Sequence, residues 1–463
     1  MARLHTRGVI LEVPVPDLSR MAMVLFGFFL CSTVATTSAG AQELAGRDKL
    51  RAHSQEFRQE VIRVTDGVYV AVGFDLANAI LIEGTDGVII VDTLSSTNAA
   101  RAVKAEFDKI SSKPVRAIIY THHHVDHVGG AAVFAGGDAP RVYAHESLLE
   151  ENRAANVGRG GRDGGNQFGT GLPDDLRIND GIGPGLVLGG GNGFIPPTNT
   201  FAGPRTRIEV AGVTIDLVHA PGETDDQIYV WLPQKRVLLA GDNFYRAFPN
   251  LYAIRGVPLR RVDWWVDSLT KMLDERPEHL VPSHSRPISG AGAVNSALTA
   301  YRDGAKSVLD QTIAGMRAGL RPDELVAMVR LPPDLASNPY LQEFYGTVAW
   351  SVRAIYTYYL GWFDGNATNL FPLSTGDRAS RLVDLLGGEA ATLAQVRAAL
   401  SRGELQWAAE LADYVLAGQP LHAEARQLKA RALTELGERQ MNAGARNFYL
   451  SSAQYLLRPP PAR

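Results

Sequence analysis

The chain has 463 residues, of which 45% are hydrophobic and 21% are charged. This composition is that of a globular protein with room for two or three domains. Its formal net charge of -3 excludes the broadly basic surface that binds nucleic acid, so we expect no nucleic-acid partner.

The N-terminal segment, residues 1–41, has the pattern of a secretory signal peptide. Arg20 precedes an apolar run at 22–30, and small residues lead to Ala-Gly-Ala at 39–41. That run is too short for a stable membrane span. We therefore expect cleavage before Gln42 and a periplasmic or secreted protein, with an uncleaved N-terminal anchor as the alternative.

The single cysteine, Cys31, lies inside this segment. It follows Phe-Phe-Leu at 28–30, whereas a lipoprotein cleavage site has small residues before the cysteine. The processed chain would therefore contain no cysteine, which excludes disulfides, thiolate metal ligands and cysteine nucleophiles.

Strand and helix patterns alternate over the next hundred residues. The expected elements are a polar helix at 43–60, strands at 68–72, 79–83 and 88–92, a helix at 97–110, and strands at 115–120 and 141–144. This alternation predicts a layered α/β domain.

A histidine-rich loop follows the expected strand at 115–120. Its spacing, His-x-His-x-Asp-His from His122 to His127, concentrates imidazole and carboxylate groups of the kind that bind zinc. His122 and His124 alternate and can face one ion, while Asp126 and His127 can turn toward a second. His123 between them is expected to point away. The alternative is a histidine-rich surface turn.

A glycine-dense segment at 156–200 carries no apolar period. It can be read as a flexible linker. Because long loops inside compact domains usually serve binding or closure, we favour a loop over the active site.

Further potential ligands stand at the ends of later strands. The expected elements are a hairpin at 206–210 and 213–218, strands at 228–232 and 237–242, a helix at 262–274, and a short strand at 280–281. Glu223 follows the hairpin, Asp242 ends a strand, and His284 follows the last one. Ligands pooled at one edge of an α/β sandwich can hold two metal ions.

From Ala293 onward the patterns are helical. Helices are expected at 306–317, 322–329, 340–358, 379–386, 393–403, 407–417 and 423–437. The pair at 393–403 and 407–417 is similar to a tetratricopeptide-type hairpin, and the region can be a cap on the catalytic domain or a dimerisation surface. The expected domains are 42–292, catalytic, and 293–455, helical, with a tail at 456–463.

Together these motifs resemble the metallo-β-lactamase superfamily, whose fold is an αββα sandwich. The landmarks are Asp92 at a strand end, the histidine loop, Ala-Pro-Gly at 220–222, Gly-Asp at 241–242 and Pro-Ser-His at 282–284. The superfamily usually has histidine after Pro-Gly, and Glu223 stands there instead.

A glutamate at that position is similar to the alkyl sulfatase branch of the superfamily. The segments that also resemble this branch are Asn-Leu-Tyr-Ala-Ile-Arg-Gly at 250–256 and, in its helical dimerisation domain, 339–347, 359–366 and 446–454. The resemblance implies a homodimeric, zinc-dependent hydrolase of anionic alkyl sulfates such as dodecyl sulfate. Many relatives continue into a sterol-carrier-like domain, and no segment up to Arg463 resembles one.

The resemblance also implies roles for individual residues. His122, His124 and Glu223 would hold one Zn²⁺, and Asp126, His127 and His284 a second, with Asp242 between them. Arg255 would bind the sulfate, and Asn250 and Tyr252 are further candidates for substrate contacts. Arg246, in the segment that departs from the relatives, is either a second anion contact or a solvated loop cation. Asp126 and Arg255 are the expected catalytic residues. Asp92 is expected to orient the ligand loop. The other histidines are expected outside the metal site, with His145 and His219 hydrogen-bonded near strand ends and His53, His279 and His422 on the surface.

Two departures from the branch leave questions open. Asp242 stands where relatives usually have glutamate, and the segment 243–249 lacks the threonines and histidines that include the relatives' proton donor. The general acid, the bond that is cleaved, the chain length and the choice between primary and secondary esters therefore stay open. The alternatives are a hydrolase of another ester, a lactone or a phosphodiester, and a binding protein that kept the metal fold without activity.

Overall fold

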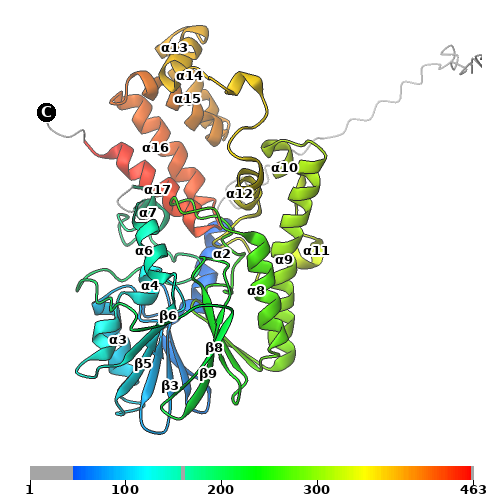
Figure 1. Ribbon diagram of the computed structural model, residues 1–463. Coiled ribbons are helices and arrows are strands. Elements are labelled where there is room, and N and C mark those ends of the chain that lie inside the picture. Colours follow the sequence, from blue (N-terminus) through cyan, green and yellow to red (C-terminus); the bar gives the residue numbers. More distant parts are fainter. Residues whose placement is uncertain (1–44, 158–161, 460–463) are drawn as a thin grey trace, which may run out of the picture. The chain divides into compact units, whose positions relative to one another are not determined.

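The computed structural model describes residues 45–157 and 162–459, so the predicted signal segment lies outside the described residues. Within the described part, a sandwich of two β-sheets carries helices on both outer faces (Figure 1). This arrangement confirms the predicted αββα layers. A search of the described helices finds none that is long and apolar enough to cross a membrane.

The first sheet has seven strands that lie side by side in chain order. They are β1 (Glu60–Thr65), β2 (Val68–Val72), β3 (Ala79–Glu83), β4 (Val88–Val91), β5 (Val115–Ile119), β6 (Arg141–His145) and β7 (Asn199–Phe201). Strands β1 to β4 pair antiparallel, whereas β4 to β7 pair parallel.

The second sheet has six strands in the order β13-β12-β11-β10-β9-β8. They are β8 (Arg205–Val210), β9 (Val213–His219), β10 (Ile228–Leu232), β11 (Val237–Gly241), β12 (His279–Pro282) and β13 (Ile288–Ser289). Only β11 and β12 pair parallel in this sheet. Their carboxyl ends therefore point to one edge, as do those of β4 and β5 in the first sheet.

Alternating apolar residues form the core between the sheets. Val68, Val70 and Val72 from β2 meet Leu217 and Val230 from the second sheet, and all are buried. The outer faces pack against amphipathic helices: α3 (Thr97–Phe107) and α5 (Ala131–Ala135) on the first sheet, α8 (Val262–Asp274) and α9 (Ala291–Arg317) on the second. Period-two alternation in the strands and 3.6-residue stripes in the helices account for these layers.

The structure corrects three expected elements. The polar helix at 43–60 ends early: α2 (Ala45–His53) and the 3₁₀ turn η1 (Ser54–Phe57) lead into β1, a strand that the sequence reading missed. Helix α9 is continuous over 27 residues and packs on α8, whereas the sequence pattern predicts a helix only at 306–317. The helix expected from 340 begins only at Val348, where the Thr347 hydroxyl caps it.

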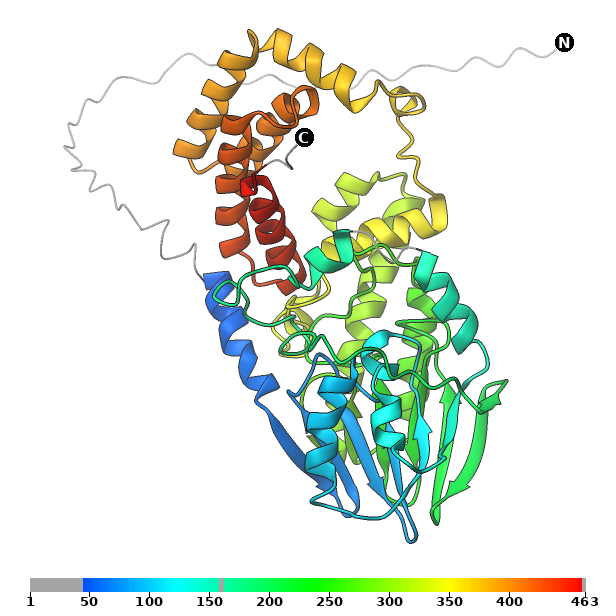
Figure 2. The same ribbon diagram turned by 90° about the vertical axis from the view of Figure 1, so that its left-hand side faces the viewer.

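The remaining helices follow α9 in the chain. They are α10 (Pro322–Met328), α11 (Pro333–Ala336), α12 (Val348–Leu360), η2 (Ala367–Asn369), α13 (Thr375–Leu385), α14 (Glu389–Ser401), α15 (Leu405–Gly418), α16 (Ala423–Glu438) and α17 (Ala443–Leu457). From α14 to α17 each helix packs against the next (Figure 2). Small buried residues such as Ala408, Ala412 and Ala430 line these contacts, which confirms the predicted alanine-rich helix hairpins.

Candidate metal centre and anion-binding site

The predicted ligands come together where strands of both sheets end. The histidine loop follows β5 and includes the short helix α4 (Val125–Val128), Glu223 follows β9, Asp242 follows β11, and His284 follows β12. Gly241 precedes Asp242 with φ +58°, and a Cβ at that position would lie 1.9 Å from the Gln227 amide nitrogen. Only glycine therefore fits this turn without displacing its neighbours.

The first cluster consists of His122, His124 and Asp242. Their ligand atoms all lie within 4.8 Å of one another. The distance from His122 Nε2 to His124 Nδ1 is 2.9 Å, and from His122 Nε2 to Asp242 Oδ2 it is 3.6 Å. Ligands bound to one zinc ion at about 2.0–2.2 Å are separated by comparable distances.

The second cluster consists of Asp126, His127 and His284, again within 4.8 Å. Asp126 Oδ2 lies 3.5 Å from His127 Nε2 and 3.6 Å from His284 Nε2. Asp242 faces this cluster too, since its Oδ2 is 3.4 Å from His127 Nε2 and 3.2 Å from His284 Nε2. Asp242 thus stands between the two clusters, where a bridging ligand would have to be.

Glu223 lies at the edge of the first cluster. Its Oε1 is 3.8 Å from His124 Nδ1 and accepts a 2.7 Å hydrogen bond from Arg260 Nη2. Both side chains of this ion pair are buried. Arg260 was missed by the sequence reading, because nothing in the sequence distinguishes it from the neighbouring Arg261.

A shell of hydrogen bonds orients the ligand loop. Asp92 accepts from the Thr121 backbone N–H, the Thr121 and Ser283 hydroxyls and His127 Nδ1, and its own φ is +56°. Nδ1 of His284 lies 2.8 Å from the Leu76 carbonyl oxygen. The bonds at Nδ1 of His127 and of His284 leave the Nε2 atom of each ring facing the second cluster.

His123 turns away from both clusters, as expected from its place between two ligands. Its Nδ1 lies 2.8 Å from the Asp226 carboxylate, and both side chains are buried. His145 and His219 stack on each other with ring centroids 3.9 Å apart and belong to neither cluster.

The donor set fits divalent cations by its unsatisfied atoms. Among the described residues, Asp242 Oδ1, Glu223 Oε2 and His127 Nε2 are buried and have no hydrogen-bond partner. Burial lowers the pKa of His127, but the carboxylates of Asp242, Asp126 and Asp92 outweigh it and raise that pKa well above its ordinary value. The carboxylates therefore favour positive charge at this position, and unpaired ligand atoms face the clusters, which are the conditions under which a divalent cation such as zinc binds.

Arg255 is the cation beside the clusters. Its Nη2 lies 3.4 Å from His124 Nε2, and its Nη1 is buried without a partner among the described residues. The guanidinium also lies over the Phe168 ring, at 5.6 Å, and the Tyr345 hydroxyl accepts from the side-chain amide of Gln167, which also contacts the Arg255 backbone. An unpaired, buried N–H group of this kind can donate a hydrogen bond to an anionic oxygen.

Two further segments complete the anion-binding site. Gln167, the last residue of α7 (Arg162–Gln167), accepts from the Arg255 backbone N–H, so part of the glycine-dense segment lies at the site as predicted. Burial raises the pKa of Tyr345 to about 12, so its phenol keeps a proton at neutral pH. Asn250 is buried, with no partner for its Oδ1 in the part of the chain that the structure describes, and Tyr252 is half-buried on the same loop.

Arg246 lies elsewhere than the sequence reading expected. Its Nη1 is 2.8 Å from Glu56 Oε1 in η1, and its guanidinium lies over the Tyr340 ring at 5.5 Å. The geometry therefore gives no support to a substrate contact for Arg246. His53, expected on the surface, is buried and lines the same groove, where it stacks on Phe344.

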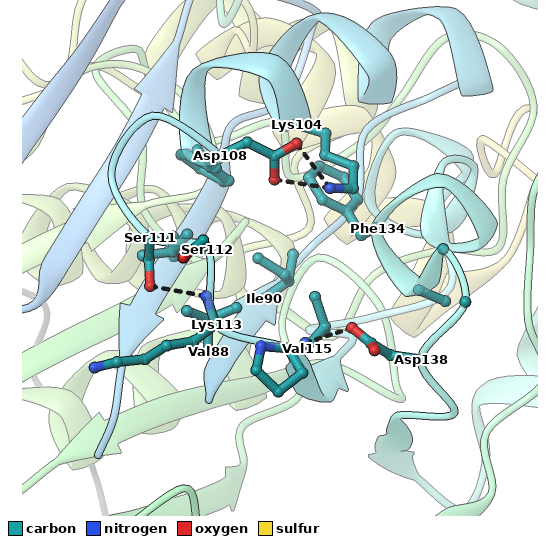
Figure 3. Close-up of a pocket in the computed structure, with 16 residues that line it drawn as sticks. Val88, Ile90, Lys104, Asp108, Ser111, Ser112, Lys113, Val115, Phe134 and Asp138 are labelled. Atoms are coloured by element: carbon teal, nitrogen blue, oxygen red, sulfur yellow. Dashed lines mark hydrogen bonds and ion pairs between the residues drawn. The ribbon is translucent and has the colours of Figure 1, made fainter. Parts of the chain in front are cut away.

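A second hollow lies at the opposite end of the first sheet, where β4 and β5 begin. It has a volume of about 290 Å³ and an apolar floor that includes Ile90 and Phe134 (Figure 3). Lys104 pairs with Asp108 at 2.7 Å, and Asp138 accepts from the Val115 backbone. Because its charged groups already have partners, this hollow offers no chemistry comparable to that of the clusters.

The site and the helices match two family models. Residues 72–284 match the metallo-beta-lactamase superfamily, and residues 321–458 match the alkyl sulfatase dimerisation domain. A linear primary-alkylsulfatase of a Pseudomonas strain is 40% identical over 394 residues, which cover 81% of this chain and 73% of that protein. The chain belongs to the alkyl sulfatase family. The resemblance stated from the motifs is thereby confirmed.

Other members of the alkyl sulfatase family differ in their named substrates. An (R)-specific secondary-alkylsulfatase of Pseudomonas sp. is 31% identical over 87% of this chain, which spans 63% of that protein. The solved structure of a stereoselective inverting sec-alkylsulfatase from Pseudomonas sp. superposes with a TM-score of 0.84 at 30% identity, over 88% of this chain and 67% of that one. The family thus includes both primary and secondary alkyl sulfatases.

Proposed function

We propose that this protein hydrolyses alkyl sulfate esters to the alcohol and inorganic sulfate at a centre of two zinc ions. The observation that carries the proposal is the half-buried side chain of Arg255, whose buried Nη1 has no partner among the described residues, beside the first of two clusters of metal-binding side chains. The named activities of the alkylsulfatase relatives support the same substrate class.

The two clusters would each hold one ion. His122, His124 and Glu223 would bind the first, and Asp126, His127 and His284 the second, while the Asp242 carboxylate would contact both. Bound divalent cations supply Lewis acidity, which acidifies water and neutralises charge on the ester oxygens. Asp92 would keep His127 in the tautomer whose Nε2 faces the ion.

The sulfate group would lie against Arg255. Its planar fork of donors matches the sulfate oxygens, and the partly desolvated surroundings strengthen the ion pair. The protonated Tyr345 phenol, which contacts Gln167, and the Asn250 side chain would help to orient the ester. Charge on the substrate, and not only its shape, would therefore decide binding.

The alkyl tail would leave through a narrow cleft that opens on the ligands. His124, Glu223 and Arg260 line its inner end, and Val257, Pro258 and Leu259 give it an apolar wall. Apolar side chains here favour a hydrocarbon tail through burial of its methylene groups. The cleft does not distinguish primary from secondary esters.

The test is sulfate release by purified, zinc-loaded protein from dodecyl sulfate, a secondary alkyl sulfate and an aryl sulfate. We expect release from at least one alkyl sulfate. Turnover of a lactone or phosphodiester without any sulfate release would overturn the proposal. Metal analysis of the same sample should find two zinc ions per chain, and their removal with a chelator should abolish sulfate release.

Substitution of Arg255 gives a more specific test of the sulfate site. Arg255→Ala should reduce kcat/KM for dodecyl sulfate by at least 100-fold, because the desolvated sulfate loses its charged partner. Arg255→Lys keeps the positive charge but not the planar fork of donors. Its kcat/KM should lie between the values of the wild type and of Arg255→Ala. Arg246→Ala is the matched control, since its guanidinium pairs with Glu56, and it should retain activity. Unchanged kinetics in Arg255→Ala would remove this residue from the sulfate site.

We further propose that the protein is an exported homodimer. The dimerisation-family match over 321–458 supports the dimer, and large apolar side chains between α12 and α13 are exposed there. Export rests on the signal pattern at 1–41, and the test is N-terminal sequencing of the protein from the periplasmic fraction. An N-terminus at Gln42 is expected, and an intact, cytoplasmic N-terminus would contradict it.

A further inference from the structure

We infer that Arg260 is a positioning residue that holds Glu223 as a ligand of one metal ion and leaves the other ion unaffected. This inference rests on the proposed two-ion centre and names a residue that acts through a ligand. Arg260 is 7% exposed, and its Nη2 donates to Glu223 Oε1 at 2.7 Å. Nη1 of the same guanidinium donates to the Asn250 backbone carbonyl.

The ion pair uses only one oxygen of the Glu223 carboxylate. Oε1 accepts from Arg260 and also lies 3.8 Å from His124 Nδ1, whereas Oε2 is buried and has no partner among the described residues. A carboxylate with one oxygen tied to a guanidinium keeps the second oxygen in a fixed direction. It can then serve as a single-oxygen ligand without searching among rotamers.

The negative charge of the buried Glu223 carboxylate requires a cationic partner such as Arg260. Three carboxylates contribute to the clusters, and Glu223 is the one that stands where related metal centres have a neutral histidine. A buried carboxylate with no cation nearby is strongly disfavoured. Arg260 supplies that cation by a direct ion pair with Glu223, whereas Asp242 has its contacts with His122, His127 and His284.

Buried residues hold the Arg260–Glu223 ion pair in place. The Arg260 guanidinium lies 6.0 Å from the ring of Trp265, which is fully buried in α8. Trp265 Nε1 donates to the Asn243 carbonyl, and the Asn243 side chain accepts from the Glu223 backbone N–H at 3.1 Å. Backbone and side chain of Glu223 are therefore fixed by two neighbouring groups of one packed unit.

Arg260 contacts only one side of the centre. Among the described residues, its hydrogen bonds reach Glu223 and the carbonyl of Asn250, and none reaches Asp126, His127 or His284. A loss of Arg260 should therefore weaken one ion selectively. A residue that merely supported the fold would weaken both ions together.

The experiment measures metal affinity of the full chain by competition with a chelator, using Zn²⁺ and, for its visible absorption, Co²⁺. In Arg260→Met one ion should bind 10- to 100-fold more weakly, the range typical of lost partners of metal ligands, with the second ion unchanged. The absorption of Co²⁺ at the weakened position should change. Arg260→Lys, which keeps a cation near Glu223, should recover most of the affinity.

A double-mutant comparison tests whether Arg260 acts through Glu223. Glu223→Gln should weaken the same ion, and adding Arg260→Met to it should cause little further loss. The matched control is Arg261→Met, because Arg261 pairs with the half-exposed Asp263 and should leave both affinities unchanged. If Arg260→Met does not fold, Arg260→Gln replaces it as a neutral variant that can still donate to Glu223.

The outcomes separate the two proposals. If the wild type binds fewer than two ions, the two-ion centre is wrong and this inference falls with it. If the wild type binds two ions and Arg260→Met binds both with wild-type affinity, only the role of Arg260 is wrong. Equal weakening of both ions, or full additivity with Glu223→Gln, would also overturn it.

Discussion

Asp92 shows how one residue can orient a metal site without being a ligand. It has φ +56°, a region that side chains rarely adopt, and its carboxylate accepts bonds from Thr121, His127 and Ser283. These partners belong to loops that follow β5 and β12. The strained backbone is therefore held by loops from both sheets, and it aims His127 at the second cluster.

Asp92→Asn should preserve the fold and lower metal affinity. The asparagine amide has nearly the same size as the carboxylate, but it carries no negative charge and its NH₂ group cannot accept a hydrogen bond. His127 would therefore lose its anionic partner. We expect a 10- to 100-fold weaker second ion in a chelator competition. Asp86→Asn, in the exposed turn before β4, is the control. Wild-type affinity in Asp92→Asn would show that the ligand loop orients itself.

The N-terminal elements α2 and η1 dock beside the site through His53. Its Nε2 lies 2.9 Å from the Gly181 carbonyl oxygen, and its ring stacks on Phe344 with centroids 3.9 Å apart. Burial, with the nearby Arg246 cation, lowers the pKa of His53 from 6.5 to about 4. Phe344 precedes Tyr345, whose hydroxyl accepts from the side-chain amide of Gln167, the residue that also contacts the Arg255 backbone.

The lowered pKa predicts acid sensitivity with a definite sign. The folded state binds a proton on His53 less tightly than the unfolded state does, so this stability is complete above pH 6.5 and is lost as the pH falls toward 4. The full loss is on the order of 2–3 kcal/mol. His53→Gln can still donate to the Gly181 carbonyl but does not titrate.

Urea unfolding at several pH values between 7.5 and 4.5 provides the measurement. As the pH is lowered, the free energy of unfolding should decrease less steeply in His53→Gln than in the wild type. Lys49, Glu56 and Arg246 line the same groove and are unchanged in the variant, so their contribution cancels in the comparison. Identical slopes would show that another group causes the acid sensitivity.

For the molecule as a whole, the helical region is joined to the catalytic site by buried polar contacts. Arg446 in α17 donates to the Leu176 carbonyl, and Asn447 donates to the Gln167 carbonyl and to Asp180. Gln167 in turn accepts from the Arg255 backbone. The dimerisation helices therefore help to place the glycine-dense segment over the anion-binding site.

The exposed apolar side chains after α12 predict where two copies meet. Trp362 is 73% exposed and Phe371 is 95% exposed, which is costly for an isolated chain. Trp362→Ser combined with Phe371→Ser should shift the protein from dimer to monomer in light scattering. Leu188→Ser, a change at a residue that is 64% exposed in the glycine-dense segment, is the control. A dimer that survives the double change would place the interface elsewhere.

The sequence by itself determined the family, the αββα layers and the ligand types. Those features depend on local patterns: apolar periods report which face of a strand or helix is buried, and the spacing from His122 to His127 is itself a chelating arrangement. Strand ends then brought Glu223, Asp242 and His284 to the same edge. The boundaries of α9 and the strand β1 were not readable, because short polar or alanine-rich stretches fit more than one element.

Only the tertiary structure decided the partners that are far apart in the chain. It joined Arg260 to Glu223 and Gln167 to Arg255, and it turned Arg246 away to Glu56. A charged side chain in a loop has no period and carries no mark of its partner in the sequence. Which carboxylate it meets depends on how the loops pack after the two sheets have closed on their common core.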